Sequence, residues 1–239
     1  PVVIVSIFVN PLQFGEGEDL ASYPRTLEAD IEKLVEAGVS ALFLPTPEVL
    51  YGDDPFLVVP PKDLINDLCG RHRPGHFEGV ATVVSKFFNI VQPQFACFGK
   101  KDYQQLKVIE AMVRALNYNI EIIPVEIERE ESGLALSSRN GYLSSEEKNE
   151  ALILSTTLQA MKARILDAVK SDLIMTEFYQ NLEEEVTQLL QSQGFEVDYL
   201  TIRDQVSLKK AHVDETKLVI LIAAKIGETR LLDNVELFI

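Results

Sequence analysis

The sequence predicts an α/β fold with an open, doubly wound parallel sheet, followed by a smaller α+β domain. Two observations predict it. Short runs rich in Val, Ile and Phe alternate with amphipathic helical patterns up to about residue 127, which is typical of a parallel sheet with helices on both faces. After residue 140, two long charged helical patterns precede a strand-rich tail.

The first part of the chain opens with a strand, a helix and a second strand. Residues 2–9 are β-branched and aromatic and end in Asn10-Pro11, a pattern typical of a buried parallel strand. Apolar residues then follow at i, i+4, i+7 and i+8 from Leu27, which predicts a helix that ends at Gly38. Residues 39–44 (VSALFL) are the next predicted strand.

The alternation continues after an interruption. Residues 45–78 are rich in Pro, Gly and Asp and are expected to be irregular. An apolar helical stripe at residues 80–91 precedes a short strand at residues 95–98, and a second stripe at residues 106–116 precedes a strand at residues 120–127. Each pair adds one strand and one helix to the predicted sheet.

The second part of the chain begins with a helix start signal. Ser144 and Glu147 form a capping box that opens a helix of roughly twenty residues. A second helix is predicted from Thr176 to Gln193, with Gly194 just past its end. Residues 195–202, 218–226 and 229–237 are the predicted strands, and Gly227-Glu228 joins the last two in a tight hairpin.

Composition excludes several classes of protein. The chain of 239 residues is 46% hydrophobic and 25% charged, which is ordinary for a soluble globular enzyme. Its apolar runs are far shorter than a membrane span requires, and no signal-peptide pattern opens it. Two cysteines form neither a disulfide framework nor a metal-binding spacing. A reducing, cytoplasmic location is therefore expected, without a membrane partner.

The charge argues against nucleic acid as a partner. The net charge is −15, whereas binding to a phosphate backbone needs clustered Lys and Arg. Between residues 62 and 107, however, seven Lys or Arg face only four Asp or Glu. This window could collect small anions, or it could be a chance cluster on a solvated face.

Ligands of such sheets bind beyond the carboxyl ends of the strands. That rule selects residues 10–14, 73–76 and 99–105. The last stretch is the strongest, because Gly99 allows a close backbone turn, the next residues open a helix whose N–H groups favour an anion, and Lys101 adds a charge. Neither Gly-x-x-x-x-Gly-Lys-Ser/Thr nor Gly-x-Gly-x-x-Gly occurs in the chain, which argues against P-loop kinases and dehydrogenases.

Residues 133–140 (GLALSSRN) join the two parts of the chain. Ser137, Ser138 and Arg139 place two hydroxyls beside a guanidinium, a combination that suits phosphate oxygens. The same residues are equally compatible with a solvated linker and a helix cap. The residues alone leave both interpretations open.

Five stretches in order resemble one family. They are residues 6–14 (SIFVNPLQF), 23–28 (YPRTLE), 73–84 (RPGHFEGVATVV), 98–106 (FGKKDYQQL) and 133–140 (GLALSSRN). Together they resemble pantothenate synthetase, the pantoate–β-alanine ligase family, from residue 2 to about 143 and more loosely through the tail. The resemblance implies a Rossmann-like fold of the nucleotidylyltransferase type.

The resemblance also implies an activity. Family members condense pantoate with β-alanine through an enzyme-bound pantoyl adenylate, using ATP with Mg²⁺ and releasing pyrophosphate and then AMP. A homodimer is expected, as is a division into a nucleotide- and pantoate-binding domain at residues 1–127, a hinge with ATP contacts at residues 128–140, and a small domain at residues 141–239.

Site residues follow from the resemblance position by position. Those expected to bind ATP are Gly99, Lys100, Lys101, Asp102, Glu128, Leu136, Ser137, Ser138 and Arg139, of which Lys101, Ser137, Ser138 and Arg139 would act in catalysis. Gln13 and Gln105 would bind pantoate and β-alanine. Asn10, Arg73 and His76 are expected near the site, without a chemical step. The sequence assigns no metal ligand.

The chain departs from the family pattern in one important respect. Family members have an earlier strand that leads to a His-x-Gly-His segment, which binds the ATP phosphates, and this chain contains no such segment. The sequence therefore predicts a fragment, or a chain that lacks its start. Loss of an inner strand would expose both neighbouring strands, so an unstable and inactive protein is expected. Lys100 is a smaller departure, since many relatives have Glu there.

Two alternatives belong to other classes. A related adenylate-forming or nucleotidyl-transferring enzyme with another acid substrate would keep the ATP stretches but lose the Gln13/Gln105 pair. An inactive nucleotide-binding fragment would keep the fold without turnover. Pantoate-dependent exchange of labelled pyrophosphate into ATP by the full-length gene product separates them.

Overall fold

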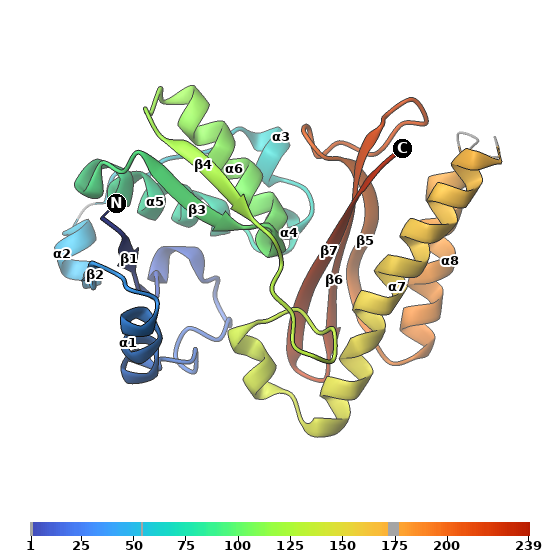
Figure 1. Ribbon diagram of the computed structural model, residues 1–239, viewed down its shortest axis with the longest axis horizontal. Coiled ribbons are helices and arrows are strands. Elements are labelled where there is room, and N and C mark those ends of the chain that lie inside the picture. The colour runs from blue at the N-terminus through green and yellow to red at the C-terminus, as the bar shows by residue number, and fades with distance from the viewer. Residues whose placement is uncertain (1, 54, 172–176) are drawn as a thin grey trace.

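The computed structural model describes residues 2–53, 55–171 and 177–239. Parallel strands occupy the first half of the chain, as predicted (Figure 1). β1 (Ile4–Ser6) pairs with β2 (Ala41–Phe43), and β3 (Phe95–Gly99) pairs with β4 (Glu121–Val125). Among the described residues, the two pairs are not hydrogen-bonded to each other.

The first strand is shorter and more exposed than the sequence predicts. Residues 2–9 were expected to form a buried strand, but β1 spans three residues and Ile4 is 43% exposed. The prediction of burial is wrong because the described part of the chain gives β1 a neighbour on one side only. An apolar strand with one neighbour keeps much of its surface in solvent.

Three helices pack around the parallel strands. α1 (Leu27–Glu36), α5 (His76–Val91) and α6 (Tyr103–Ala115) all follow the predicted apolar stripes. α5 begins four residues earlier than predicted, directly after Gly75, whose φ of 82° suits glycine. Phe77, Val80 and Ile109 are among the fully buried side chains that join α5 and α6 in one core.

The stretch predicted to be irregular, residues 45–78, contains three short helices: α2 (Pro47–Tyr51), α3 (Lys62–Ile65) and α4 (Cys69–His72). The prediction is wrong there because helices of four or five residues are too short to show a helical period. One start signal was present. The Thr46 hydroxyl accepts a hydrogen bond from the Val49 N–H at 3.4 Å, and Pro47 occupies the first helical position.

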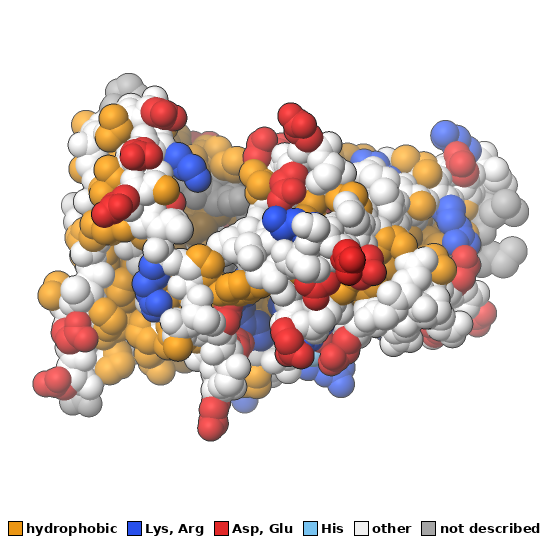
Figure 2. Space-filling view, turned by 90° about the horizontal axis from the view of Figure 1, so that it is seen from below, with side chains coloured by type: hydrophobic (Ala, Val, Ile, Leu, Met, Phe, Trp, Pro, Cys, Tyr) orange, Lys and Arg blue, Asp and Glu red, His pale blue; other side chains and the backbone are white. Residues whose placement is uncertain are grey.

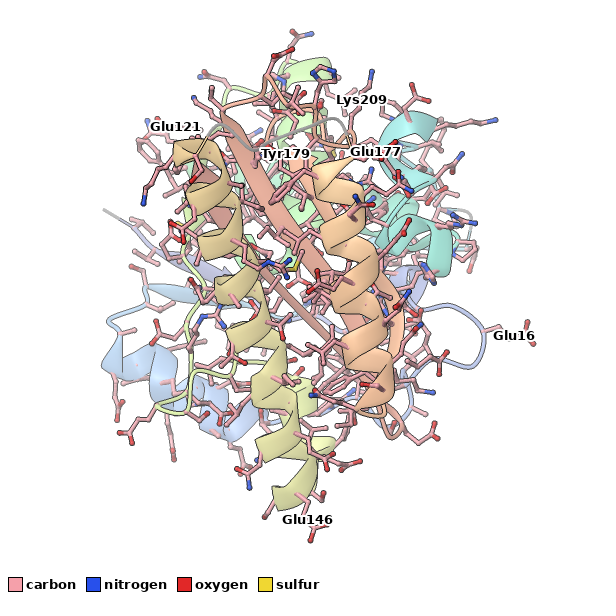
Figure 3. All side chains as sticks on the ribbon, turned by 90° about the vertical axis from the view of Figure 1, so that its right-hand side faces the viewer. Glu16, Glu121, Glu146, Glu177, Tyr179 and Lys209 are labelled. Atoms are coloured by element: carbon pink, nitrogen blue, oxygen red, sulfur yellow. The ribbon has the colours of Figure 1, made fainter. Side chains whose placement is uncertain are left out.

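The second half forms an antiparallel sheet covered by two helices. β5 (Glu196–Asp204), β6 (Lys217–Ile226) and β7 (Thr229–Phe238) lie in that order, and the predicted hairpin pairs Ile226 with Thr229. α7 (Ser145–Lys170) and α8 (Phe178–Ser192) run side by side across one face of the sheet (Figure 3).

The predicted helix signals of this half are confirmed. The Ser144 hydroxyl accepts from the Glu147 N–H at 3.1 Å, and the Glu147 carboxylate accepts from the Ser144 N–H at 2.8 Å. α7 is 26 residues long, longer than expected. The predicted start of the next helix, Thr176, lies outside the described residues, and Gly194 follows its end with a φ of 90°.

The small antiparallel sheet lies between its own two helices and the first half of the fold. Alternate residues of β6 point to opposite faces, so Leu218 and Ile220 pack under α7 and α8, whereas Val219 and Leu221 pack against Leu68 and Tyr103 of the first half. All four β6 side chains are 5% exposed or less. The sheet therefore has one face on its own helices and the other on the parallel part of the fold.

The surface agrees with the acidic composition. Asp and Glu side chains are scattered over much of the face in Figure 2, whereas hydrophobic side chains gather at its left-hand end. In the described part of the chain, no helix is both long and apolar enough to cross a lipid bilayer.

Candidate active site

Two cavities lie where the small sheet meets the loops of the first half. Both are small and open to solvent: the space inside them, counted together with the solvent at their mouths, is about 420 Å³ in the first and about 260 Å³ in the second. Predicted site residues line both: Arg73, His76, Lys101, Asp102 and Gln105 line the first, and Lys101 and Ser137 line the second. Lys101 is thus the predicted residue that the two cavities share.

Lys100 and Lys101 are adjacent but differ in their surroundings. The Lys100 ammonium lies between the carboxylates of Glu126 and Glu236, which together hold the pKa of Lys100 above its ordinary value despite the opposing effect of burial. No ion pair in the described part of the chain includes Lys101. Lys101 therefore offers an uncompensated positive charge to the cavities, and Lys100 does not line them.

The loop after β1 carries Gln13 on a short 3-10 helix, η1 (Pro11–Gln13). Asn10, which is 1% exposed, fixes this loop. Its Oδ1 accepts from the Leu12 N–H at 3.2 Å, so its Nδ2 is the atom that donates to Gln13 Oε1 at 3.1 Å. The two Gln13 Nε2 hydrogens have no acceptor among the described residues, so Gln13 can donate them to a hydroxyl or carboxylate ligand.

Arg73 and His76 support the same loop from the start of α5. The Arg73 guanidinium forms a two-pronged ion pair with Glu18, and its Nη2 donates to the Gln13 carbonyl at 3.3 Å. The His76 ring bridges Gln13 O, at 2.9 Å from Nδ1, and Arg73 Nη1, at 3.2 Å from Nε2. Since a carbonyl only accepts and a guanidinium only donates, His76 carries its proton on Nδ1 and is neutral.

His76 should remain neutral well below pH 6. Burial, together with the charge of Arg73, lowers the pKa of His76 to about 4. The unfolded chain then binds a proton near pH 6.5 that the folded chain does not take up until about pH 4. The free energy of unfolding should therefore fall, by up to about 3 kcal/mol, as the pH drops through that window.

Denaturant unfolding between pH 4 and 7 checks this prediction. His76→Gln should flatten part of the pH dependence, because Gln does not titrate. His212→Gln is the matched control, since His212 is 64% exposed at the side chain beside Asp214. If the free energy of unfolding of His76→Gln depends on pH as steeply as that of the wild type, or if both variants flatten this dependence equally, His76 is not buried and neutral.

The 3-10 helix η3 (Ser138–Tyr142) begins with Ser138 and Arg139, and Ser137 lies directly before it. Arg139 donates from Nε and Nη2 to the Asp19 carboxylate, at 3.0 and 2.7 Å, and lies over the Tyr23 ring. Burial alone would raise the pKa of Asp19, but Arg139 holds it below its usual value. Ser138 donates to the Tyr23 hydroxyl at 3.0 Å.

These contacts attach η3 to the loop that follows Gln13. That loop extends into solvent at its tip, where Glu16 points away from the molecule in Figure 3. Ser137 lines the second cavity, and its hydroxyl accepts from the Arg139 N–H at 3.2 Å. Arg139 and Ser138 line neither cavity in this arrangement.

Glu128 and Leu136 face each other across a narrow turn. The Leu136 N–H donates to the Glu128 carbonyl at 2.9 Å, and an antiparallel bridge pairs Arg129 with Ala135. Both Glu128 and Leu136 are exposed. Inside the turn, Asn140 donates to the Ala135 carbonyl at 3.0 Å, while its buried Oδ1 has no hydrogen-bond partner among the described residues.

Residues of the small domain complete the cavities, and the sequence reasoning missed them. Tyr199, Asp233 and Asn234 line the first cavity, and Asp233 also lines the second. A signal existed, because two adjacent polar residues interrupt the apolar strand pattern at 233 and 234. Of the partners of Arg139, Tyr23 opens the family-like stretch at residues 23–28, whereas Asp19 carried no comparable signal.

Comparison with known proteins identifies the family. The family model described as pantoate-beta-alanine ligase matches residues 1–236. The pantothenate synthetase of Laribacter hongkongensis is 53% identical over 238 residues, covering 99% of this chain and 83% of the relative. That of Neisseria meningitidis serogroup C is 50% identical over 236 residues, covering 98% of this chain and 82% of the relative.

Solved structures agree. The crystal structure of pantothenate synthetase from Thermus thermophilus has a TM-score of 0.91 at 41% identity, covering 100% of this chain and 84% of that one. The crystal structure of the Francisella tularensis pantoate-beta-alanine ligase, complexed with beta-gamma ATP and beta-alanine, has a TM-score of 0.74 at 34% identity. The match covers 98% of this chain and 79% of that one. By sequence and by fold, this chain belongs to the pantoate–β-alanine ligase family.

Proposed function

We propose that the full-length gene product joins pantoate to β-alanine in two steps that use ATP, at the site whose residues this chain carries. A pantoate carboxylate oxygen attacks the α-phosphorus of ATP, the bond to the β-phosphate oxygen breaks, and pyrophosphate leaves. The β-alanine amine then attacks the acyl carbon of the bound pantoyl adenylate, loses a proton, and displaces AMP. Family membership supports the overall ligation, and the two-step route is the chemistry that the site favours.

The uncompensated charge of Lys101 is the observation that carries this proposal. Both reactants of the first step are anions, so the protein must supply positive charge where negative charge develops on the phosphorus oxygens. Lys101 stands at the boundary of both cavities and has no carboxylate partner in the described ranges. We place Lys101 where the acid, beside Gln105 in the first cavity, and the ATP phosphates, beside Ser137 in the second, would meet.

Gln13 and Gln105 suit a polyhydroxy acid. Both side chains are neutral, and a lining of carboxylates would repel an anionic substrate. We assign them to the pantoate hydroxyls and carboxylate, and we assign Asp102 to the ribose. Neutral His76 and the Arg73–Glu18 pair hold the Gln13 backbone, so they position this side of the site without a chemical step.

Ser137, Ser138 and Arg139 are proposed to bind the ATP phosphates. The Arg139 guanidinium is paired with the Asp19 carboxylate in this structure. The ATP phosphates would therefore have to replace that carboxylate or bind the guanidinium beside it. Phosphate is a strong competitor, since it accepts the same two-pronged pair with more charge. We propose that residues 128–140 act as the hinge between domains at residues 1–127 and 141–239, and that closure brings η3 onto the nucleotide.

Arg139→Ala should therefore depress pyrophosphate exchange far more than stability. The exchange rate is expected to fall about 100-fold, while loss of the half-buried Asp19 pair lowers the free energy of unfolding by less than about 1 kcal/mol. Asp19→Asn is the control, because it weakens the same pair but keeps the guanidinium. Equal losses of activity and stability in Arg139→Ala would reduce the segment to a linker.

Magnesium would enter with ATP in this proposal. Among the described residues, no group of three His, Cys, Asp or Glu side chains could hold a metal ion. Mg²⁺ is commonly bound by substrate phosphates, a few waters and one or two carboxylates, which fits a cavity lined by Asp102. Its charge would add to that of Lys101 on the phosphates.

A homodimer in the cytoplasm is the expected state. The family resemblance supports the dimer. Phe56 and Val59, which are 93% and 65% exposed on the same connecting segment, are apolar side chains that such an interface would cover. Sedimentation at several protein concentrations tests the association.

The two-step route has a direct isotopic test. Pantoate labelled with ¹⁸O in its carboxylate should transfer one labelled oxygen to AMP, because that oxygen bridges carbon and phosphorus in the adenylate. Mass spectrometry of AMP reads the result. Label in orthophosphate with release of ADP would instead show an acyl phosphate, and unlabelled AMP would contradict the adenylate.

A further inference from the structure

Strand β7 of the small sheet reaches into the first half of the fold at three closely spaced residues, Asp233, Asn234 and Glu236. β7 is an edge strand of its sheet, paired among the described residues with β6 alone, and in Figure 1 it lies on the side of that sheet that faces the first half. Asp233 and Asn234 are 5% and 3% exposed. Polar side chains that are buried to this degree nearly always form hydrogen bonds within the protein.

Asn234 bonds to the backbone of the loop that carries Lys101. Its Nδ2 donates to the carbonyl of Lys100 at 2.8 Å and to the carbonyl of Lys101 at 3.0 Å. Each peptide unit is planar and trans, so fixing a carbonyl also fixes the N–H on its other side. The two bonds therefore set the planes of the peptides on both sides of Lys101, and with them the direction in which its side chain leaves the backbone.

Asp233 holds the other segment proposed to bind ATP, but through the side chain of Arg129. Its carboxylate accepts from both Nη atoms of Arg129 at 2.8 Å and from the Asn234 N–H at 2.7 Å. Arg129 in turn donates to the Gly133 carbonyl at 3.0 Å, across the turn that precedes η3. Adjacent residues of one strand thus set the relative position of the two segments proposed to bind ATP.

We propose that Asn234 is a positioning residue for the reaction and acts through Lys101. The small domain then does more than cover the site, because its edge strand shapes the backbone that presents the phosphate-binding charge. This inference rests on the proposed function for its kinetic effect, whereas its structural content, that Asn234 fixes residues 100–102, stands independently of the substrate.

Asn234→Ala removes both bonds, and Asn234→Asp keeps the shape but replaces the donor by an acceptor. In each variant, the rate constant of pantoate-dependent pyrophosphate exchange is expected to fall on the order of 100-fold, the effect of a misplaced group. KM for ATP should change by less than about threefold, since ATP keeps its other contacts. In a Lys101→Ala background, Asn234→Ala should add little further loss, because the group through which it acts is already absent.

Gln205 supplies a matched control. It is 7% exposed and also donates from one amide nitrogen to two carbonyls, those of Leu218 and Leu237 at 2.8 and 3.3 Å. Both acceptors lie in the small sheet. Gln205→Ala and Gln205→Glu should therefore lower stability comparably to the Asn234 variants while changing the exchange rate by less than about twofold.

Amide hydrogen exchange of the ligand-free protein provides a readout independent of activity. Residues 100–103 should exchange faster in Asn234→Ala than in the wild type or in Gln205→Ala. No difference there, or full additivity of Asn234→Ala with Lys101→Ala, would overturn the inference even if the wild type is active. A wild-type protein without pyrophosphate exchange would contradict the proposed function instead, and the amide readout would still decide the role of Asn234.

Discussion

Lys101→Ala is expected to reduce pantoate-dependent pyrophosphate exchange by about 10²–10³-fold, the usual effect of removing a preorganised group that stabilises charge in a transition state. Stability should barely change. The Lys101 ammonium has no ion-pair partner in the described part of the chain, and surface-type substitutions without such a partner shift the free energy of unfolding by about 0.5 kcal/mol or less. Single-turnover exchange and denaturant unfolding measure the two quantities.

Lys100→Ala is the matched control, because it removes the same side chain one position earlier. Its ammonium is held by Glu126 and Glu236, so its loss should lower the free energy of unfolding by about 1–2 kcal/mol. The rate of pyrophosphate exchange should fall less than about tenfold in Lys100→Ala. If the two variants exchange their roles, with activity lost in Lys100→Ala and stability lost in Lys101→Ala, the assignment of the phosphate-binding charge is wrong.

Gly79→Ala is expected to disable the pantoate side of the site. A Cβ on Gly79 would lie 2.4 Å from the Leu12 carbonyl oxygen and 2.6 Å from the Gln13 nitrogen, so the backbone of η1 must move. Within a helix, Ala is favoured over Gly by about 1 kcal/mol, but overpacking of this kind usually costs about 1–3 kcal/mol. The clash should therefore prevail.

The functional effect of Gly79→Ala should appear in the affinity for pantoate. Displacement of Gln13 by even about 1 Å can weaken a positioned contact 100-fold, so KM for pantoate should rise much more than KM for ATP. Gly141→Ala is the control, since a Cβ there meets nothing within 4 Å. Equal KM values for pantoate in the wild type and in Gly79→Ala would show that η1 does not hold this substrate.

Periodic elements of the fold were predictable from the sequence. The alternation of strands and helices, the capping box at Ser144 and the hairpin at Gly227 all arise from local preferences that adjacent residues reveal. The short helices α2, α3 and α4 were not predictable, because their length is close to one helical turn. The exposure of β1 did not follow from its own apolar residues. It followed from the family resemblance, which predicted that the strands beside an absent inner strand would be exposed.

The candidate site divides in the same way. The stretches that resemble the family identify Gln13, Lys101 and Arg139 as site residues. The residue type alone tells which of them carry a charge and which carries an amide. Their surroundings depend on partners distant in the chain: Arg139 meets Asp19 across 120 residues, and Asn234 meets the Lys101 backbone across 133. Identical side chains at 100 and 101 therefore have different surroundings, which only the folded structure distinguishes.

The central claim, that this site adenylates pantoate, is tested most directly by exchange of labelled pyrophosphate into ATP without β-alanine. We expect exchange that requires pantoate, saturates with it, and is not supported by other small hydroxy acids. Exchange independent of pantoate, or supported equally by other acids, would contradict the assignment of Gln13 and Gln105. Complete absence of exchange by the full-length gene product, with ATP and pantoate both present, would contradict the account as a whole.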